Sequence, residues 1–439
     1  MRRRGRRLTV AAGSAVGDLV RGPELYGVSN PAGAALEPGS VVHMTLGTAF
    51  HPRTFELNQK LAWEEWSGYH AASVYADYHD IEYNAIREQV AAIDVSPLFK
   101  YLVSGPDAMR LVDRVVTRNA GKQQVDQVYY AVWCDDRGKV VDDGTITRLS
   151  PTTYRWTAAE PSLRWLELMA NGLDVEVDDV TDSVAALAVQ GPRSRALLEQ
   201  VTGRDWTDVR YYRRRAATIA GLEVDVTRTG YTGDLGYELW VDAEHALDLW
   251  DALFDAGSMF GLRPAGTRAL DVVRVEAGLI LIDADYTGVR QAYSDEQEYS
   301  PFEIGLGRLV HFDKADFVGK AALVAEQEAG GPPRRLVGLT YDYEDIEAAF
   351  AAHGLPTTLL PETSSERVPL HHRGNRVGCV TSSTWSPILK RLIALASVDA
   401  RHSEEGTRLN VEWTVQGYRH SVGCRVVPLP FLDLPRKRD

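Results

Sequence analysis

The pattern of apolar and polar positions contains one strand-turn-helix unit twice. Residues 103–115 and 189–201 each begin with an apolar extended run, pass through Gly-Pro, and end with apolar positions at helical spacing. A proline fits the first turn of a helix because its missing N–H has no partner there, so Pro106 and Pro192 are predicted to lie in first turns. The copies lie about 86 residues apart, whereas solenoid repeats recur every roughly 20 to 50 residues. The pattern therefore predicts duplicated α+β half-domains.

Strand-like alternation fills the segment between the two units and continues after the second. Residues 128–132, 139–149 and 154–158 are predicted to form neighbouring strands of an antiparallel sheet. Residues 222–229 and 237–241 are predicted to pair as a hairpin around a glycine-rich turn.

Helical spacing predicts one helix over residues 81–91 and another over residues 244–254. Regular structure is expected to begin near Trp63. The segment 326–333 ends in Gly-Gly-Pro-Pro and is predicted to be a linker. Beyond it, short strand signals about ten residues apart predict a small β-barrel that ends near Val427.

A chain of 439 residues is too long for one ordinary core, so two or three packed units are expected. Residues 1–45 are predicted to be a flexible N-terminal extension. Their arginine-rich start also resembles an export signal, but its apolar stretch is short and is broken by Gly13. We predict a domain of two interleaved lobes over residues 46–328 and a C-terminal β-barrel domain over residues 334–430.

The composition of the chain disfavours several kinds of binding partner. The chain has 61 acidic and 48 basic residues and a formal charge of −13, which disfavours nucleic acid and anionic lipid. No apolar run approaches the roughly 18 residues that a membrane span needs. Cys134, Cys379 and Cys424 stand alone, without the spacing of a metal site, and suit a reducing compartment. We expect a soluble, cytoplasmic protein without a bound metal.

Two sequence features suggest chemistry, since the phosphate-loop, dinucleotide, HExxH and GxSxG motifs are absent. Asp142 and Asp143 lie on one predicted strand, so only one of them can face a given cavity, where its carboxylate would be partly desolvated. A solvated hairpin is the alternative. The segment RTGYTGDLGYE, Arg228 to Glu238, combines glycines with a carboxylate at Glu238 that can accept paired hydrogen bonds and an aromatic face at Tyr231. Taken by itself, a glycine-rich turn of this kind is more often a purely structural hairpin.

The segment RTGYTGDLGYE resembles the hallmark of the glycine-cleavage T-protein family, which comprises tetrahydrofolate-dependent aminomethyltransferases and related demethylases. Further segments of the chain follow the order of the family: DVSPLFKYLVSGPDA, YAVWCDDRGKVVDD, AVQGPRS, RPAGTRALDVVRVEAGL, SPFEIGLGRLVHFDKADFVGK and GCVTSSTWSPILKRLIALA. The resemblance runs from about residue 60 to residue 430.

The resemblance implies a three-lobed cloverleaf around a channel that tetrahydrofolate and the one-carbon donor enter from different sides. By motif, Asp143 corresponds to the catalytic carboxylate beside the pterin N5. Tyr130 corresponds to a pocket tyrosine, Glu238 to the glutamate that holds the pterin, and Tyr231 to its neighbour in that pocket.

The chain also departs from the pattern of the family. DVSHMG becomes Asp94 to Phe99 without the histidine, an expected asparagine is missing after Trp156, and GARD becomes Arg268 to Asp271. Arg268 is predicted to replace a lost polar contact with folate. Four aromatic residues are the remaining candidates: Trp66, Phe99, Tyr101 and Trp133. They are expected either to line a pocket for a methylated amine, ether or sulfonium, or to pack in the core. The segment 283–286 either meets a cationic donor or is a solvated loop.

These departures favour a tetrahydrofolate-dependent demethylase or methyltransferase that acts on a small methylated donor. Glycine cleavage with a lipoyl carrier protein is the alternative within the family. A non-catalytic folate-binding protein is the alternative of another class, although the KGC and GQE motifs of the assembly branch are absent. An idle paralogue that binds folate without turnover is a further alternative.

Overall fold

A computed structural model describes residues 45–439, so the predicted extension over residues 1–45 lies almost wholly outside the described residues. Regular structure begins earlier than Trp63. A small sheet has the order β1-β3-β2, and α1 carries Pro52 in its first turn, where a proline is tolerated. The elements are β1 (Leu46–Gly47), α1 (His51–Leu57), β2 (Ala62–Trp66) and β3 (Tyr69–Val74).

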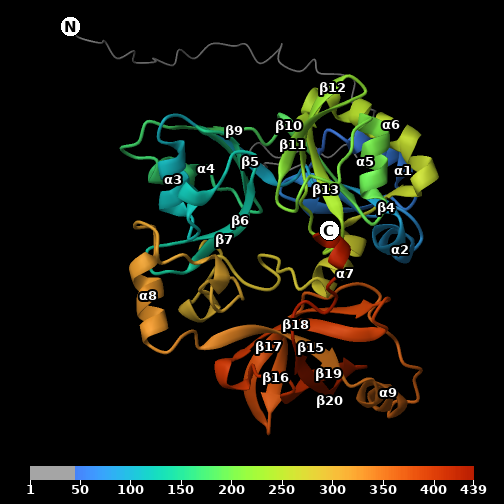
Figure 1. Cartoon of the computed structure of the whole chain (residues 1–439). Helices are drawn as coiled ribbons and strands as arrows, with labels where there is room; N and C mark the ends of the chain where they lie inside the picture. Colours follow the sequence, from blue (N-terminus) through green and yellow to red (C-terminus); the bar gives the residue numbers. More distant parts are fainter. Residues whose placement is uncertain (1–44) are drawn as a thin grey trace, which may run out of the picture. The chain divides into compact units, whose positions relative to one another are not determined.

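The first repeated unit belongs to a five-stranded sheet with the order β6-β7-β8-β5-β9. Its strands are β5 (Phe99–Ser104), β6 (Val128–Cys134), β7 (Val140–Ser150), β8 (Thr153–Ala158) and β9 (Glu176–Asp179). The helices α3 (Ala108–Val115) and α4 (Leu163–Met169) share a hydrophobic core with one face of this sheet (Figure 1). The antiparallel pairing of β6, β7 and β8 confirms the prediction from alternation.

The second unit belongs to a six-stranded sheet with the order β11-β12-β13-β10-β4-β14. Its strands are β4 (Val90–Asp94), β10 (Val184–Gln190), β11 (Arg214–Ile219), β12 (Leu222–Thr227), β13 (Gly236–Asp242) and β14 (Leu262–Pro264). One face packs on α5 (Ser194–Thr202) and α6 (Ala246–Gly257), and the other on α2 (Asp80–Glu88) and α7 (Thr267–Glu276). The hairpin prediction is confirmed, but the helix predicted over residues 81–91 ends at Glu88 because Val90 begins a buried strand.

The two units share one turn geometry. Gly105 and Gly191 both have φ of +127°, a conformation that glycine adopts without strain. A Cβ atom at Gly105 would lie 2.7 Å from a backbone oxygen, and one at Gly191 would lie 2.6 Å from another. The duplication is therefore confirmed. The prolines, however, precede the helices, because Asp107 and Arg193 are the residues that cap α3 and α5.

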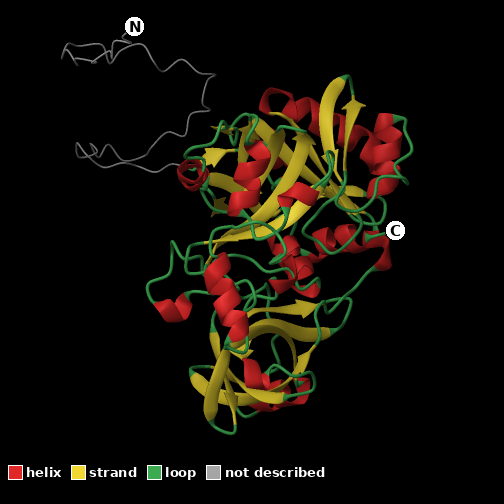
Figure 2. Ribbon diagram, turned by 60° about the vertical axis from the view of Figure 1, so that its left-hand side comes forward, coloured by secondary structure: helices red, strands yellow, loops and turns green. Residues whose placement is uncertain are grey.

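The last lobe is a closed barrel with the order β15-β18-β17-β16-β19-β20, whose strands curve around a buried core (Figure 2). The strands are β15 (Arg334–Tyr341), β16 (Val368–His372), β17 (Asn375–Ser386), β18 (Arg391–Asp399), β19 (Arg408–Val415) and β20 (Tyr418–Val427). The helix α9 (Tyr343–Ala351) packs on β19 and β20. The helix α8 (Lys320–Glu328) occupies the start of the predicted linker. The fold is α+β with a C-terminal barrel, as predicted, whereas the domain boundaries remain a prediction.

The segment after Val427 leaves the barrel and contacts the six-stranded sheet and α7. The N–H of Leu432 donates to the carbonyl of Glu276 over 2.9 Å. Arg436 binds the buried carboxylate of Asp234 through two nitrogens, at 2.6 and 2.8 Å. This segment therefore connects the barrel to the turn that contains the RTGYTGDLGYE motif.

Candidate functional site

Asp143 on β7 is the centre of a cluster of tyrosines. Its Oδ2 accepts a 2.7 Å hydrogen bond from the hydroxyl of Tyr130, and its Oδ1 accepts a hydrogen bond from the hydroxyl of Tyr286. Tyr130 opposes Thr145 in the sheet and is thus a diagonal neighbour of Asp143 on the same face. Asp143 is intermediate in exposure between the core and the surface, so its carboxylate is not sealed in the core as that of Asp142 is.

The neighbouring Asp142 faces the other side of the sheet, as strand alternation requires. It is fully buried and opposes Trp133, and within residues 45–439 its oxygens accept only the backbone N–H groups of Asp143 and Glu160. Burial raises the pKa of both carboxyls, and the charge of Asp143 raises the pKa of Asp142 further. The two tyrosine hydroxyls favour the charged form of Asp143, whereas Asp142 has no hydroxyl donor, so ionisation is favoured more at Asp143 than at Asp142.

The segment from Ile280 to Tyr286 links the RTGYTGDLGYE turn to Asp143. The hydroxyl of Tyr231 donates to the carbonyl of Ile280, and the hydroxyl of Tyr286 donates to Asp143 at the other end. The charge of Asp143 contributes, after burial, to raising the pKa of Tyr231, as expected for neighbours. Sequence reasoning had noted Tyr286 only as part of an acidic segment and had missed this contact.

Asp285 in this segment is neither solvated nor free to meet a donor. It is fully buried and forms a 2.6 Å ion pair with Arg274 of α7. Its other oxygen accepts hydrogen bonds from the hydroxyls of Thr381 at 2.6 Å and Ser382 at 2.8 Å, both on β17 of the barrel. Asp285 therefore fixes the loop that carries Tyr286.

The two carboxylate oxygens of Glu238 on β13 differ in their hydrogen bonding. Its Oε2 accepts hydrogen bonds from Thr229 at 2.6 Å and Thr227 at 3.4 Å. Its Oε1 has no hydrogen-bond partner within residues 45–439. Burial raises the pKa of Glu238.

The face of the five-stranded sheet that carries Asp143 lies against the six-stranded sheet. Arg155, which shares that face, forms a 2.6 Å ion pair with Asp225 of β12 and lies 4.2 Å from the ring centroid of Trp240 on β13. Trp240 lies two positions after Glu238 on the same face of β13. The side chains of Asp143 and Glu238 thus belong to facing surfaces of two neighbouring sheets.

The glycines of the RTGYTGDLGYE turn leave room for the neighbouring side chains of Gln190 and Ala277. A Cβ atom at Gly230 or Gly236 would lie 2.0 or 2.2 Å from Oε1 of Gln190, and one at Gly233 would lie 2.4 Å from the Cβ of Ala277. Gln190 donates to the carbonyls of Thr229 and Tyr237 at 3.1 Å. The turn is therefore held around a buried glutamine, which fixes both ends of the segment that bears Tyr231.

Other candidates lie apart from this cluster. Arg268 forms a 2.9 Å ion pair with Glu362, and both side chains are nearly half exposed. Tyr101 and Trp133 are buried under α3 and α4, and Phe99 packs against the same core, on the sheet face opposite to Asp143. Trp66 packs on the core between the six-stranded sheet and α7.

The cluster has the donor and acceptor groups that a flat heterocycle with N–H groups requires. The free Oε1 of Glu238 is an acceptor, Asp143 is a second carboxylate, and the tyrosines Tyr130 and Tyr286 lie beside Asp143.

No group of three or more metal-ligating side chains occurs among the residues that the structure describes, nor does any helix there have the length and hydropathy to cross a membrane.

Comparison with known proteins gives consistent results. Residues 50–314 match the GCVT N-terminal domain, and residues 334–433 match the glycine cleavage T-protein C-terminal barrel domain. An aminomethyltransferase of Streptomyces coelicolor is 36% identical over 80% of this chain and 88% of its own. An aminomethyltransferase of Caldanaerobacter subterraneus is 33% identical over 75% of this chain and 82% of its own.

A trimethylamine-oxide aldolase of Ruegeria pomeroyi is 35% identical over 91% of this chain, which spans about half (49%) of that relative. The crystal structure of aminomethyltransferase T of the glycine cleavage system from Bartonella henselae has a similar fold. It matches with a TM-score of 0.75 at 23% identity, over 89% of this chain and 98% of that one.

Proposed function

The chain belongs to the glycine-cleavage T-protein family, and we propose that it transfers a one-carbon group from a small methylated donor to tetrahydrofolate. The observation that supports this most directly is the carboxylate of Asp143, held by the hydroxyls of Tyr130 and Tyr286 and only partly buried. A carboxylate in that state accepts a proton from a neighbouring nitrogen.

Each residue of the cluster has a proposed part. Glu238 accepts hydrogen bonds from the pteridine through its free Oε1, while Thr229 fixes the other oxygen and so the orientation of the carboxylate. Tyr231 offers an aromatic face, and its hydroxyl is tied to Ile280. Such positioning matters because a misplacement of about 1 Å can cost about 100-fold in rate. Arg268, Trp66, Phe99, Tyr101 and Trp133 have no part in this proposal, because their contacts lie elsewhere.

The transfer balances without an oxidant if the donor is a methylated ammonium or sulfonium ion. The bond from the carbon to the donor heteroatom breaks and leaves its electron pair on that atom, while a bond forms to the folate nitrogen. That nitrogen loses one proton, which Asp143 accepts. Asp143 also stabilises positive charge on the nitrogen during the transfer when its carboxylate is ionised, the form that the two hydroxyls favour.

Aminomethyl transfer from a lipoyl carrier is the second candidate. It is supported by aminomethyltransferase relatives that share 33–36% identity with this chain over most of their length. The 35% identity to a trimethylamine-oxide aldolase supports a methylated amine as the donor instead. The replacement of the family's DVSHMG by Asp94 to Phe99, without histidine, adds to the case for a donor other than the lipoyl-bound aminomethyl group.

The test is to incubate the purified protein with tetrahydrofolate and a panel of donors that includes a quaternary ammonium ion, a sulfonium ion and an amine N-oxide. Mass spectrometry then identifies the folate product. Methyltetrahydrofolate from the ammonium or sulfonium ion supports the proposal, as does methylenetetrahydrofolate with the demethylated amine from the N-oxide. Methylenetetrahydrofolate with ammonia from a loaded lipoyl carrier supports the second candidate. The absence of any folate product, or normal turnover by Asp143→Asn, would overturn the assignment.

A further inference from the structure

A cavity of about 450 Å³ lies between the small N-terminal sheet and the β9 edge of the five-stranded sheet. This volume falls within the roughly 300–1,000 Å³ of sites that hold small organic ligands. The cavity is called the Tyr69 cavity below. The residues that give its wall its chemistry come from β1, β3, the start of β5, the end of β9 and the segment before β10: Leu46, Tyr69, Phe99, Asp179, Thr181 and Asp182.

One part of this wall is apolar and aromatic. Leu46 is 62% exposed, and the rings of Tyr69 and Phe99 are partly exposed. Phe99 is one of the residues for which the sequence left a pocket and the core as alternatives, and it both packs on the core of its sheet and borders the cavity. Apolar side chains and aromatic rings of this kind suit the methyl groups of a ligand, and an aromatic face also attracts a cation.

The other part of the wall carries two carboxylates. Oδ1 of Asp179 accepts the N–H of Thr181 over 2.9 Å, and Oδ1 of Asp182 accepts a hydrogen bond from the hydroxyl of Tyr69. Oδ2 of each has no hydrogen-bond partner within residues 45–439. Burial first, and then the contact with Asp182, raise the pKa of Tyr69, so its hydroxyl stays a neutral donor.

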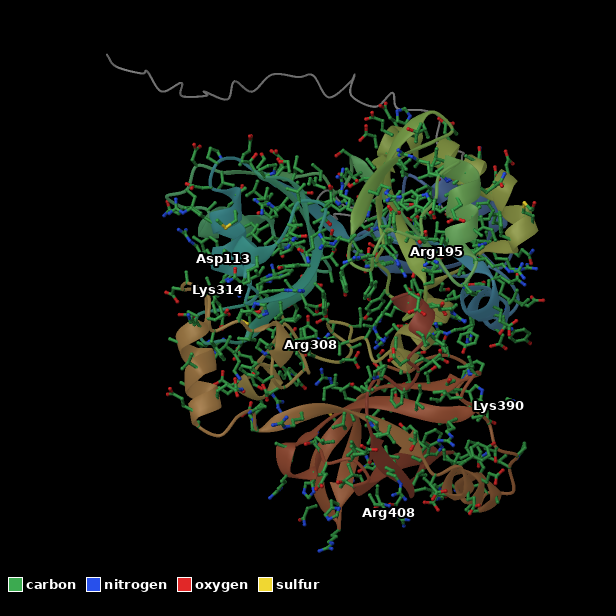
Figure 3. All side chains as sticks on the ribbon, in the orientation of Figure 1. Asp113, Arg195, Arg308, Lys314, Lys390 and Arg408 are labelled. Carbon is green, nitrogen blue, oxygen red and sulfur yellow. The ribbon has the colours of Figure 1, made fainter. Side chains whose placement is uncertain are left out.

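These two carboxylates form no ion pair within the part of the chain that the structure describes. Asp113 on α3, which packs on the same sheet, does have a partner, since it pairs with Lys314 at 3.1 Å, as Figure 3 shows. Lys100 of β5 is close enough for the two carboxylates to act on its charge. Its Nζ, however, is bound to the carbonyls of Ser96 and Leu98, each over 2.7 Å. A cation from outside the chain would therefore meet two uncompensated negative charges.

The wall fits an organic cation better than a metal ion. Asp179 and Asp182 belong to no group of three or more ligating side chains in the described chain, and hard cations prefer many oxygen ligands. We infer that the Tyr69 cavity binds a small methylated ammonium ion, with the methyl groups against the apolar wall and the charge between the carboxylates. The cavity lies apart from the Asp143 cluster, because Phe99 is on the sheet face opposite to Asp143.

Direct binding tests this without folate or turnover, so the result does not depend on the proposed function. The full protein is titrated with choline and with 3,3-dimethylbutan-1-ol, in which a carbon replaces the charged nitrogen, and Kd is measured by calorimetry. We expect choline to bind at least about tenfold more tightly, since each contact of the charge with a ring or a carboxylate adds a factor of about two to five.

Variants assign the effect to the cavity. Asp179→Asn combined with Asp182→Asn should weaken choline by about tenfold and leave the neutral alcohol within about twofold, because asparagine keeps the shape and removes the charge. Glu176→Gln combined with Asp178→Asn is the matched control. It removes two exposed carboxylates of the same strand that do not line the cavity, and should change Kd for choline by about twofold or less.

The aromatic contact has its own variant. Phe99→Leu keeps an apolar side chain without a π face, so it should weaken choline by about two- to fivefold and leave the neutral alcohol nearly unchanged.

Three outcomes would overturn the inference. The first is that the wild-type protein binds choline no more tightly than the neutral alcohol, or does not bind it. The second is that both double variants weaken choline equally, which would show a general effect of the acidic strand. The third is that a short peptide with one trimethyllysine binds at least about tenfold more tightly than choline, which would assign the cation to a partner protein.

Discussion

The hydroxyl of Tyr286 should set the pH range in which Asp143 works. The change Tyr286→Phe leaves Asp143 with one hydroxyl donor, that of Tyr130. A hydrogen bond to a charged group contributes about 1.5–3 kcal/mol, and the partial exposure of Asp143 places this one near the lower limit. Since about 1.4 kcal/mol corresponds to one pKa unit, the pKa of Asp143, already raised by burial, should rise by about one further unit.

The sign of the effect on activity follows from the role of Asp143 as a proton acceptor, which requires its ionised form. A higher pKa moves the acidic limb of the pH profile of kcat/KM to higher pH. Below that limb the variant should be slower by about tenfold, and above it the rate should return towards that of the wild type. The measurement is kcat/KM from about pH 5 to about pH 9 with the donor that gives turnover.

Tyr154→Phe is the matched control. Tyr154 lies on β8 of the same sheet, and its buried hydroxyl has no hydrogen-bond partner in the described structure, so its removal should leave the acidic limb in place. A uniform loss of activity at all pH values in Tyr286→Phe would refute the reasoning, because it would show that the hydroxyl does not act through the ionisation of Asp143.

Three further changes test the site and its support. Asp143→Asn should lower kcat by about 100-fold or more while the circular dichroism spectrum stays that of the wild type; retained activity would exclude a proton-accepting role. Glu238→Gln should raise Kd for 5-formyltetrahydrofolate by about tenfold, as the loss of one charged acceptor predicts, and an unchanged Kd would place the pteridine elsewhere. Asp285→Asn removes the fully buried carboxylate that pairs with Arg274, which keeps only the partly exposed Asp271 as an ion-pair partner, and should lower the free energy of unfolding by about 3 kcal/mol, visible as a lower urea midpoint; an unchanged midpoint would contradict the ion pair.

Local patterns of the sequence were sufficient for much of the fold. Strand alternation predicted the pairing of β6, β7 and β8 and implied that Asp142 and Asp143 face opposite sides of the sheet. The repeated Gly-Pro turn predicted the duplication. The structure confirms it, because Gly105 and Gly191 adopt the same positive φ. Strand alternation depends on contacts within a few residues, and the duplication is visible as a repeated segment of the sequence.

Features that depend on distant contacts were not predictable. Tyr286 reaches Asp143 across 143 residues from an irregular loop, which has no periodicity to mark the tyrosine. The helix predicted over residues 81–91 was too long, because the apolar run from Val90 belongs to a buried strand that pairs with β10 and β14. For the aromatic candidates, sequence alone did not distinguish a pocket from a core.

The barrel contributes to the site without supplying a residue that touches Asp143. Thr381 and Ser382 of β17 donate to Asp285, and Asp285 also accepts the N–H of Leu281, at the start of the loop that ends in Tyr286. Because the side chains of Asp285 and its ion-pair partner Arg274 are fully buried, displacing the loop would break this buried ion pair, at a cost of several kcal/mol. The position of the Tyr286 hydroxyl is therefore set by contacts between the barrel and α7, and a change in the packing of the barrel against α7 should alter the ionisation of Asp143.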